Sequence, residues 1–341
     1  MTMAIRDIFK TLTANSPEQG YRAAKESVVF LDRGDMGHLI VSGADHADLL
    51  HRMTTNELRN LTPGQAQFNV FTNEKGRIID RVHLLKLDNA MRLITSAGSN
   101  QRVAQWIEKF VFIEDVKIED RSGDIGMLTF IGPQTEFFLD KVLDVKTGGL
   151  PAHTFLALDD GSIIVKSALN SLPVFDVVLP NVVRDDFARK VNAGEDGQRP
   201  FFVGGDIYKI LCIEAGWPLY PADFNEELNP HEVNMLGFVN FDKGCYIGQE
   251  VVARLDTYEK VQRKMIGVRL QEELRYEQTP VMAEGKEIGT VTSAAFSPGI
   301  GQPIALATVK TKFARVGEAI IVDDRGRQVK GWLSALPFDS S

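Results

Sequence analysis

Residues 67–95 read QFNVFTNEKGRIIDRVHLLKLDNAMRLIT, and this stretch decides how the first part of the chain folds. Apolar residues gather in three runs, at 67–71, 77–87 and 91–95, which is typical of β-strands that pack on a core. Residues 72–76, TNEKG, separate the first two runs with residue types that form turns. We therefore predict three consecutive strands, the first two joined by this turn.

Helical patterns flank these strands. Residues 44–53 have the spacing of a helix with one buried face, and Ser99 is a suitable N-cap for a helix whose apolar face runs from Val103 to Phe110. The elements predicted nearer the N-terminus are a helix at 5–12, which ends before Asn15-Ser16-Pro17, and short strands at 28–31 and 39–41. Strands joined in hairpins are therefore mixed with packed helices, as in α+β proteins.

A second unit of the same kind begins near Ile125. Its predicted elements are a strand at 125–131, a helix opened by Pro133, strands at about 162–168 and 173–179, and a helix at about 182–193 closed by Gly194. After Val261 the pattern changes to short strands separated by Gly and Pro, at 265–270, 286–292, 304–309, 319–322 and 329–333. This tail indicates a small β-barrel or sandwich.

The length of 341 residues corresponds to two or three domains. The patterns assign residues 1–120 to a first α+β subdomain, 121–260 to a second one whose boundary with the first can interleave, and 261–341 to the barrel. We find no sequence repeat of fixed period. The fold class predicted is α+β with a C-terminal β-barrel.

Charge and cysteine content exclude several classes of function. Asp and Glu number 46 against 38 Lys and Arg, and the net charge of −8 argues against direct nucleic-acid binding. Two cysteines, Cys212 and Cys245, cannot form a disulfide framework or supply the four ligands of a structural zinc site, and the six histidines show no metal-ligand spacing. We expect a cytoplasmic protein with no signal peptide, no membrane span and no metal site.

The densest segment for chemistry is 210–254, which contains Lys243-Gly244-Cys245-Tyr246-Ile247-Gly248-Gln249-Glu250. Lys243 beside the thiol could favour the thiolate and so make Cys245 a nucleophile. A buried cysteine at a helix start beside a solvated lysine is the alternative. Glu214 follows three apolar residues in a strand or at a helix edge, where burial requires a partner: either a heterocycle with N–H donors or a nearby Lys or Arg.

Taken together, these segments resemble the superfamily of the glycine-cleavage T protein (GcvT), a folate-dependent aminomethyltransferase, and its YgfZ-type relatives. The matching segments, which span nearly the whole chain, are Asp35–His38 with Gly43, Phe71–Asp80, Glu214–Gly216 with Pro218–Tyr220, Pro230 and Glu232, Ser297-Pro298, and Ile304–Ala307. The resemblance implies a three-lobed cloverleaf around a central channel that binds tetrahydrofolate. Residues 1–120 would then be a folate-binding subdomain.

Two features point to the YgfZ branch of this superfamily. Residues 243–250, KGCYIGQE, are identical to the signature of that branch, including the cysteine that T proteins do not share. T proteins carry paired aspartates after the turn, and the second, assigned to the reacting folate nitrogen, is Arg81 here. An arginine stays protonated and cannot act as a general base. Cys212 likewise replaces the arginine that usually lies two residues before the glutamate.

The resemblance implies a tetrahydrofolate-binding accessory protein for iron–sulfur cluster assembly or repair, which indirectly supports methylthiolation of tRNA. Its partners would be folate and iron–sulfur client or assembly proteins. The folate contacts would be Glu214, Asn73, Tyr220, Lys243 and Arg254, and the thiol of Cys245 would be required for function. The enzymatic alternative is a one-carbon transferase or demethylase that uses Asp80 as acid and base, so whether the chain is an enzyme stays open. A third alternative is a module that only binds folate and recruits a partner.

Overall fold

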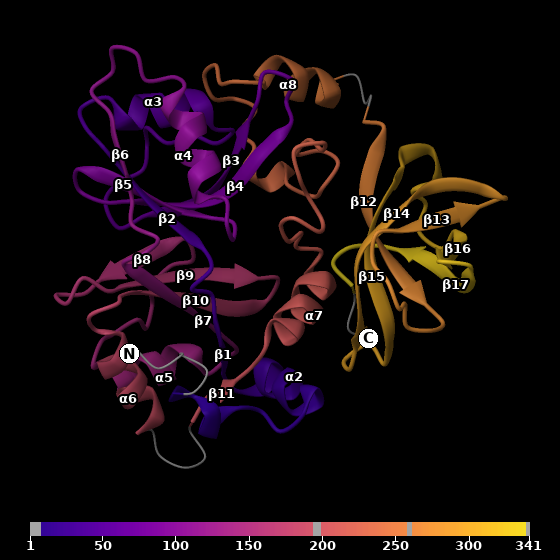
Figure 1. Ribbon diagram of the computed structural model, residues 1–341, viewed down its shortest axis with the longest axis horizontal. Coiled ribbons are helices and arrows are strands. Elements are labelled where there is room, and N and C mark those ends of the chain that lie inside the picture. Colours follow the sequence, from indigo (N-terminus) through magenta and orange to yellow (C-terminus); the bar gives the residue numbers. More distant parts are fainter. Residues whose placement is uncertain (1–7, 194–198, 258–260, 339–341) are drawn as a thin grey trace. The chain divides into compact units, whose positions relative to one another are not determined.

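The computed structural model describes residues 8–193, 199–257 and 261–338 (Figure 1). The chain divides into two compact units, each assembled from separate segments. The first comprises Met1–Leu49, Leu58–Phe68 and Val82–Tyr208, and the second comprises Leu50–Glu57, Asn69–Arg81 and Lys209–Ser341. Because the strands around the turn at 72–76 pass from one unit to the other, residues close in sequence serve both units.

The first unit contains a six-stranded sheet in the order β11-β1-β7-β10-β9-β8. Its strands are β1 (Val29–Asp32), β7 (Ile125–Ile131), β8 (Thr154–Ala157), β9 (Ile163–Leu169), β10 (Leu172–Pro180) and β11 (Phe201–Phe202). One face carries aromatic side chains, among which Phe30 and Phe130 stack with ring centroids 5.1 Å apart. Helices α5 (Thr135–Leu143) and α6 (Arg184–Asn192) pack on that face through Phe138 and Phe187. Helix α2 (Pro17–Glu26) contacts β1 and β11.

A five-stranded sheet follows the order β3-β4-β5-β2-β6. Its strands are β2 (Gly37–Ser42), β3 (Ala66–Thr72), β4 (Ile78–Lys86), β5 (Ala90–Thr95) and β6 (Lys117–Asp120), with helices α3 (His46–Met53) and α4 (Asn100–Glu108) between them in sequence. Helix α4 packs on β2 and β6. On the opposite face, Leu85 and Ile94 join Met127, Val165 and Val178 of the six-stranded sheet in one apolar cluster. Two layers of strands thus share a core in the first unit.

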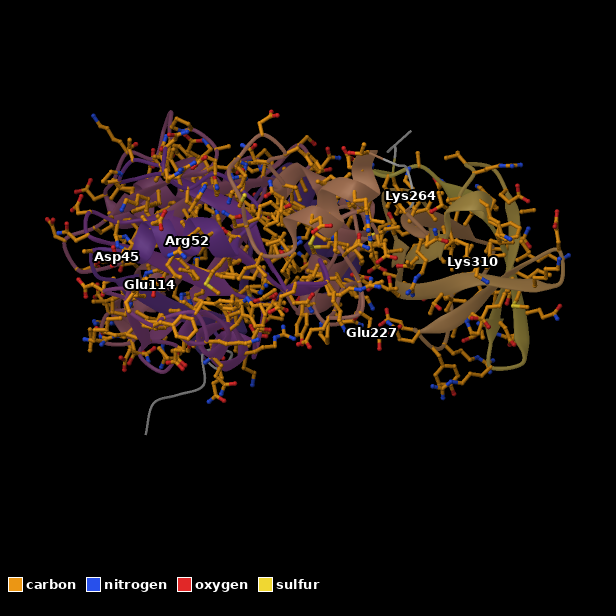
Figure 2. All side chains as sticks on the ribbon, turned by 90° about the horizontal axis from the view of Figure 1, so that it is seen from above. Asp45, Arg52, Glu114, Glu227, Lys264 and Lys310 are labelled. Atoms are coloured by element: carbon orange, nitrogen blue, oxygen red, sulfur yellow. The ribbon has the colours of Figure 1, made fainter. Side chains whose placement is uncertain are left out.

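The second unit is built on a closed barrel in the order β12-β15-β14-β13-β16-β17 (Figure 1). Its strands are β12 (Arg263–Leu270), β13 (Thr279–Ala283), β14 (Lys286–Ser297), β15 (Gln302–Lys310), β16 (Ala319–Asp324) and β17 (Arg327–Ser334). Helix α7 (Gly205–Ala215) enters this unit from the first, and α8 (Gln249–Thr257) and the 3-10 turns η2 (Leu236–Phe238) and η3 (Thr311–Phe313) belong to it. Val70 and Ile78 pack in one cluster with Ile304 and Leu306 of the barrel. Charged side chains such as Lys264 and Lys310 lie on the outside (Figure 2).

The predicted fold class is confirmed: two sheets with packed helices are followed by a six-stranded C-terminal barrel. The three ranges 1–120, 121–260 and 261–341 stay a prediction, and β1 shows how the first two interleave, since it pairs with β7 of the second range. None of the helices in the described ranges has the length and apolarity needed to cross a membrane.

Several local predictions are corrected. Of the helix predicted at 5–12, residues 5–7 lie outside the described residues, Ile8 is helical and the 3-10 turn η1 (Lys10–Leu12) follows, while the helix α2 after Asn15-Ser16-Pro17 was not predicted. Ser99 precedes α4 without a side-chain capping bond, and α5 begins at Thr135, two residues after Pro133. The strands not anticipated are β6, β8, β11 and β13, and Gly194 lies outside the described residues.

Candidate functional site

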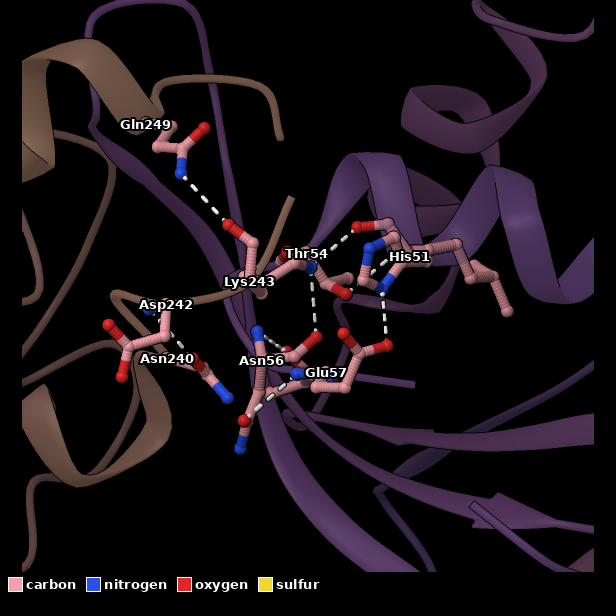
Figure 3. Close-up of polar contacts among 10 residues, drawn as sticks. His51, Thr54, Asn56, Glu57, Asn240, Asp242, Lys243 and Gln249 are labelled. Atoms are coloured by element: carbon pink, nitrogen blue, oxygen red, sulfur yellow. Dashed lines mark hydrogen bonds and ion pairs between the residues drawn. The ribbon is translucent and has the colours of Figure 1, made fainter. Parts of the chain in front are cut away.

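The segment 243–250 is held to the loop after helix α3 by a buried lysine. The Lys243 ammonium group donates to the carbonyl oxygens of His51 (2.6 Å), Thr54 (2.6 Å) and Asn56 (2.9 Å), as Figure 3 shows. An ammonium group has three N–H donors, and these carbonyls use all three. The side chain is only 6% exposed, so the contacts also compensate its loss of hydration. Lys243 therefore anchors this segment.

Tyr246, Ile247 and Gly248 also hold the segment in place. The Ile247 N–H donates to the Arg52 carbonyl at 3.0 Å, and the Thr72 hydroxyl donates to the Ile247 carbonyl. Gly248 has φ +87°, and a Cβ there would lie 2.4 Å from the Asn73 carbonyl oxygen, so only glycine fits. The Tyr246 ring is buried, and desolvation raises the pKa of its hydroxyl to about 12. Backbone and side chains together fix the path of the chain on both sides of Cys245.

Cys245 itself is exposed. The thiol lies between buried Lys243 and buried Tyr246, four residues before α8 begins. The alternative of a buried cysteine at a helix start is therefore wrong, and so is a solvated Lys243. The ammonium protons of Lys243 are directed to three carbonyl groups, and activation of the thiol by Lys243 stays a prediction. Cys212, by contrast, is fully buried in α7.

Asn73 organises the turn between β3 and β4. Its side-chain oxygen accepts from the N–H groups of Lys75 (2.9 Å) and Arg77 (3.0 Å), an Asx-type turn. Arg77 in turn pairs with Glu232 at 3.1 Å. The predicted folate-contact residue Asn73 thus has its carbonyl oxygen committed to the backbone.

Asp80 and Arg81 follow each other on β4 and point to opposite sides of the strand. Asp80 is fully buried. The Arg81 guanidinium donates to the Pro218 carbonyl at 3.0 Å and lies 4.2 Å from the centre of the Trp217 ring. Arg81 is therefore held in place by a carbonyl group and an indole ring.

Glu214 lies in helix α7 and is buried, which settles its secondary structure as helical. Its Oε1 accepts from the Ser297 hydroxyl at 2.6 Å, and its backbone carbonyl accepts from Phe338 N–H. Tyr220 is half-buried beside Phe224, with ring centroids 5.5 Å apart. Arg254 is exposed on α8.

Known proteins and protein families are similar to this chain. Two family models match: the GCVT N-terminal domain at residues 7–168 and the glycine cleavage T-protein C-terminal barrel domain at 263–339. The aminomethyltransferase of Aquifex aeolicus is 30% identical over 320 residues, which cover 93% of this chain and 85% of the relative. The chain belongs to the glycine cleavage T-protein family. The aminomethyltransferase of Thermotoga neapolitana is 25% identical over 334 residues, covering 93% and 87% of the two chains.

A solved structure of this T-protein family has the same fold. The crystal structure of glycine cleavage system aminomethyltransferase T from Bartonella henselae superposes with a TM-score of 0.87. The match covers 96% of this chain and 91% of that one, at 21% sequence identity. At that identity the likeness concerns the fold.

The carboxyl group of Asp176 was not predicted as a site residue from the sequence. Asp176 lies on β10 in the first unit, half-buried, and its Oδ1 accepts from the Thr129 hydroxyl at 2.6 Å. Desolvation raises the pKa of the Asp176 carboxyl, although Thr129 and Arg33 act in the opposite direction. Arg33 lies over the Tyr208 ring, 4.7 Å from its centre. An aspartate in the strand 173–179 could have been noticed as a polar residue in an apolar run.

Proposed function

We propose that this protein binds tetrahydrofolate and acts as an accessory factor in the assembly or repair of iron–sulfur proteins, through the thiol of Cys245. The observation that carries this proposal is the exposure of Cys245 on a loop whose neighbours are fixed by Lys243, Ile247 and Gly248. A thiol must be accessible to react with a partner, and a fixed backbone keeps it accessible. Support for tRNA methylthiolation would then be indirect, through cytoplasmic iron–sulfur client enzymes.

The residue Arg81 argues against aminomethyl transfer as the function of this protein. A guanidinium offers only donors and cannot take a proton from the folate nitrogen or a substrate. The contacts of Arg81 with Pro218 and Trp217 also hold its side chain in place, so another group cannot take its position and act as the base. Asp80 is fully buried on the other side of the strand, which argues against its acting as the acid and base.

The folate contacts we propose rest on carboxylates. The pterin ring presents neighbouring amino and N–H donors, and a carboxylate accepts both in a bidentate pair that offsets its desolvation. Glu214 and Asp176 are both desolvated carboxyl groups, each with one oxygen already bound to a hydroxyl. Tyr220 and Arg254 stay candidates for the rest of the ligand. Asn73 and Lys243 are better understood as residues that position the loops.

The experiment is complementation of a bacterial strain that lacks its own YgfZ-type protein. Wild type, Cys245→Ala and, as a matched control, Cys212→Ala would be expressed, and a 4Fe–4S-dependent activity would be assayed under oxidative stress. We expect rescue by wild type and by Cys212→Ala, and none by Cys245→Ala at equal protein level. Rescue by Cys245→Ala equal to wild type would contradict a role for the thiol.

The second candidate function is folate-dependent aminomethyl transfer or demethylation. The names of the relatives favour it, since the proteins 25% and 30% identical to this chain are called aminomethyltransferases. Formation of methylene- or methyl-tetrahydrofolate at steady state would establish it. Loss of that activity in Asp80→Asn, with folding intact, would assign Asp80 to the reaction.

A further inference from the structure

The second unit contains a cavity of about 890 Å³ that takes no part in the site proposed above. It lies between the segment 222–228 and the outer face of the barrel, where β12, β14, β15 and the turn η3 supply lining residues. Two of these residues, Glu227 and Lys310, are labelled in Figure 2. Sites for small molecules usually measure about 300–1,000 Å³, so this cavity has the size of a ligand site.

Two cations lie directly opposite each other on the wall of this cavity. Arg263, the first residue of β12, pairs in register with Lys310, the last residue of β15, and both line the cavity. Lys312 lines it too, two residues further along the chain. Like charges directly opposite each other on neighbouring strands are destabilising. A negatively charged ligand between Arg263 and Lys310 would remove this repulsion.

The acids of the protein compensate these cations only in part. Glu232 lies 3.6 Å from Arg263 Nε, but it also pairs with Arg77 at 3.1 Å. The Lys310 ammonium group donates to an uncharged group, the Glu287 carbonyl, at 2.9 Å. One carboxylate is thus shared by two arginines, and Lys310 has no carboxylate partner among the described residues.

Hydroxyl groups line another part of the cavity. Thr290 on β14 is directly opposite Thr308 on β15, and both line the cavity. The neighbours of Thr308 in sequence, Ala307 and Val309, belong to the barrel core, so the Thr308 side chain faces outward. Cross-strand partners share a face, and the two hydroxyls are therefore on the same side of the sheet. A hydroxyl both donates and accepts, which suits a ligand that carries hydroxyl groups of its own.

Two carboxylates complete the polar lining. Glu227 and Glu287 form no ion pair within the part of the chain that the structure describes, so their oxygens are available to accept from ligand hydroxyls. None of the described residues that line the cavity is aromatic. Proteins commonly hold nucleobases by stacking them on aromatic rings. The lining therefore favours an aliphatic ligand over a nucleotide.

We propose that this cavity binds a sugar phosphate. A phosphate monoester carries a charge of about −1.5 to −2 at pH 7, more than a single carboxylate, and so complements several cations. Arg263 binds it through two parallel N–H groups and Lys310 as a point charge, while Lys312 adds a third positive charge. The sugar hydroxyls bond to Thr290, Thr308 and the two carboxylates. The site is independent of the folate and thiol chemistry proposed above.

Ribose 5-phosphate is the probe for this site. Its binding to the full-length protein would be measured by isothermal titration calorimetry at low salt. We expect saturable binding to wild type and to Lys264→Met, a control that removes a neighbouring exposed charge outside the cavity lining. Lys310→Met should weaken binding by at least about tenfold, and Thr290→Val by about three- to tenfold. No saturable binding to wild type, or equal affinity in Lys310→Met and wild type, overturns the proposal.

Related compounds test which part of the ligand is recognised. Ribose without phosphate and inorganic phosphate without sugar should each bind at least about tenfold more weakly than ribose 5-phosphate. Adenosine monophosphate should gain no affinity over ribose 5-phosphate, because the described lining residues offer no aromatic ring. Inorganic phosphate bound as tightly as ribose 5-phosphate would mean an adventitious ion only, and tighter binding of adenosine monophosphate would reject the sugar phosphate as the ligand class.

A crystal structure of the full-length protein with ribose 5-phosphate gives a readout that needs no variant. We expect phosphate oxygens within hydrogen-bonding distance of Arg263 and Lys310, and sugar hydroxyls toward Thr290 and Thr308. A ligand bound elsewhere, or one seen in the crystal without saturable binding in solution, overturns the proposal.

Discussion

Replacing Lys243 with methionine tests whether the segment 243–250 is fixed from its buried end. Methionine keeps the apolar length of the side chain and removes the ammonium group, so the carbonyl oxygens of His51, Thr54 and Asn56 lose their donor. A hydrogen bond to a charged group contributes roughly 1.5–3 kcal/mol. Three such bonds are opposed by the desolvation of a buried ion, which costs several kcal/mol. We expect the free energy of unfolding to fall by roughly 2–4 kcal/mol.

Urea unfolding measures this change, and amide hydrogen exchange localises it. The exchange of the Ile247 N–H, which donates to the Arg52 carbonyl, should accelerate, as should the reaction of Cys245 with a thiol reagent. Lys264→Met is the matched control, because Lys264 is exposed on β12 and its loss should change stability by less than about 0.5 kcal/mol. A loss below about 0.5 kcal/mol in Lys243→Met, with unchanged exchange at Ile247, would refute the anchoring role.

Three further predictions concern titration and ligand binding. The pKa of His38 is about 3 in the fold against an ordinary 6.5, so the unfolded chain binds the proton first. Stability should therefore fall as pH drops from 6.5 toward 3, by roughly 4–5 kcal/mol at most, and His38→Gln should remove this part of the slope in acid-unfolding curves. The pKa of Tyr246 is about 12 in the fold against an ordinary 10.0, which has the opposite consequence. The contribution of the neutral Tyr246 hydroxyl to the stability of the fold is fully present below pH 10 and is lost between pH 10 and 12. Unfolding curves in that window should be flatter for Tyr246→Phe than for wild type, and identical slopes would reject the buried hydroxyl as the cause. Calorimetric titration with tetrahydrofolate should show affinity weakened by about 1–3 kcal/mol in whichever of Glu214→Gln and Asp176→Asn removes the pterin partner. Unchanged affinity in both variants would mean that neither carboxylate binds the pterin.

Patterns confined to one strand or helix could be predicted from the sequence. The runs in 67–95 gave β3, β4 and β5, because short apolar runs bounded by turn residues are a local signal. Helix α2 was overlooked because, apart from Tyr21, the residues it buries are small (Gly20, Ala23 and Ala24) and make a weak apolar stripe. Its capping signal was nevertheless present, since the Ser16 side chain accepts from Gln19 N–H and Pro17 follows it.

The site could be predicted only in part, because its contacts join distant segments. The sequence singled out Lys243 and Cys245, but it could not show that carbonyl groups 187 to 192 positions earlier use the Lys243 donors. Asp176 was missed for a similar reason. On a strand with one solvent-facing side an aspartate is ordinary, and only the second sheet, which shares the cluster of Val178, makes that side interior.

The claim that this protein binds tetrahydrofolate without transferring a one-carbon unit is tested most directly against a relative named aminomethyltransferase. Purified protein would be given tetrahydrofolate and a panel of methylated and aminomethylated amines and sulfur compounds, with the Aquifex aeolicus aminomethyltransferase as the positive control. We expect this protein to bind tetrahydrofolate but to form no methylene- or methyl-tetrahydrofolate above background, because the guanidinium of Arg81 cannot act as a general base. Turnover comparable to that of the control would contradict it and would make the protein a one-carbon transferase.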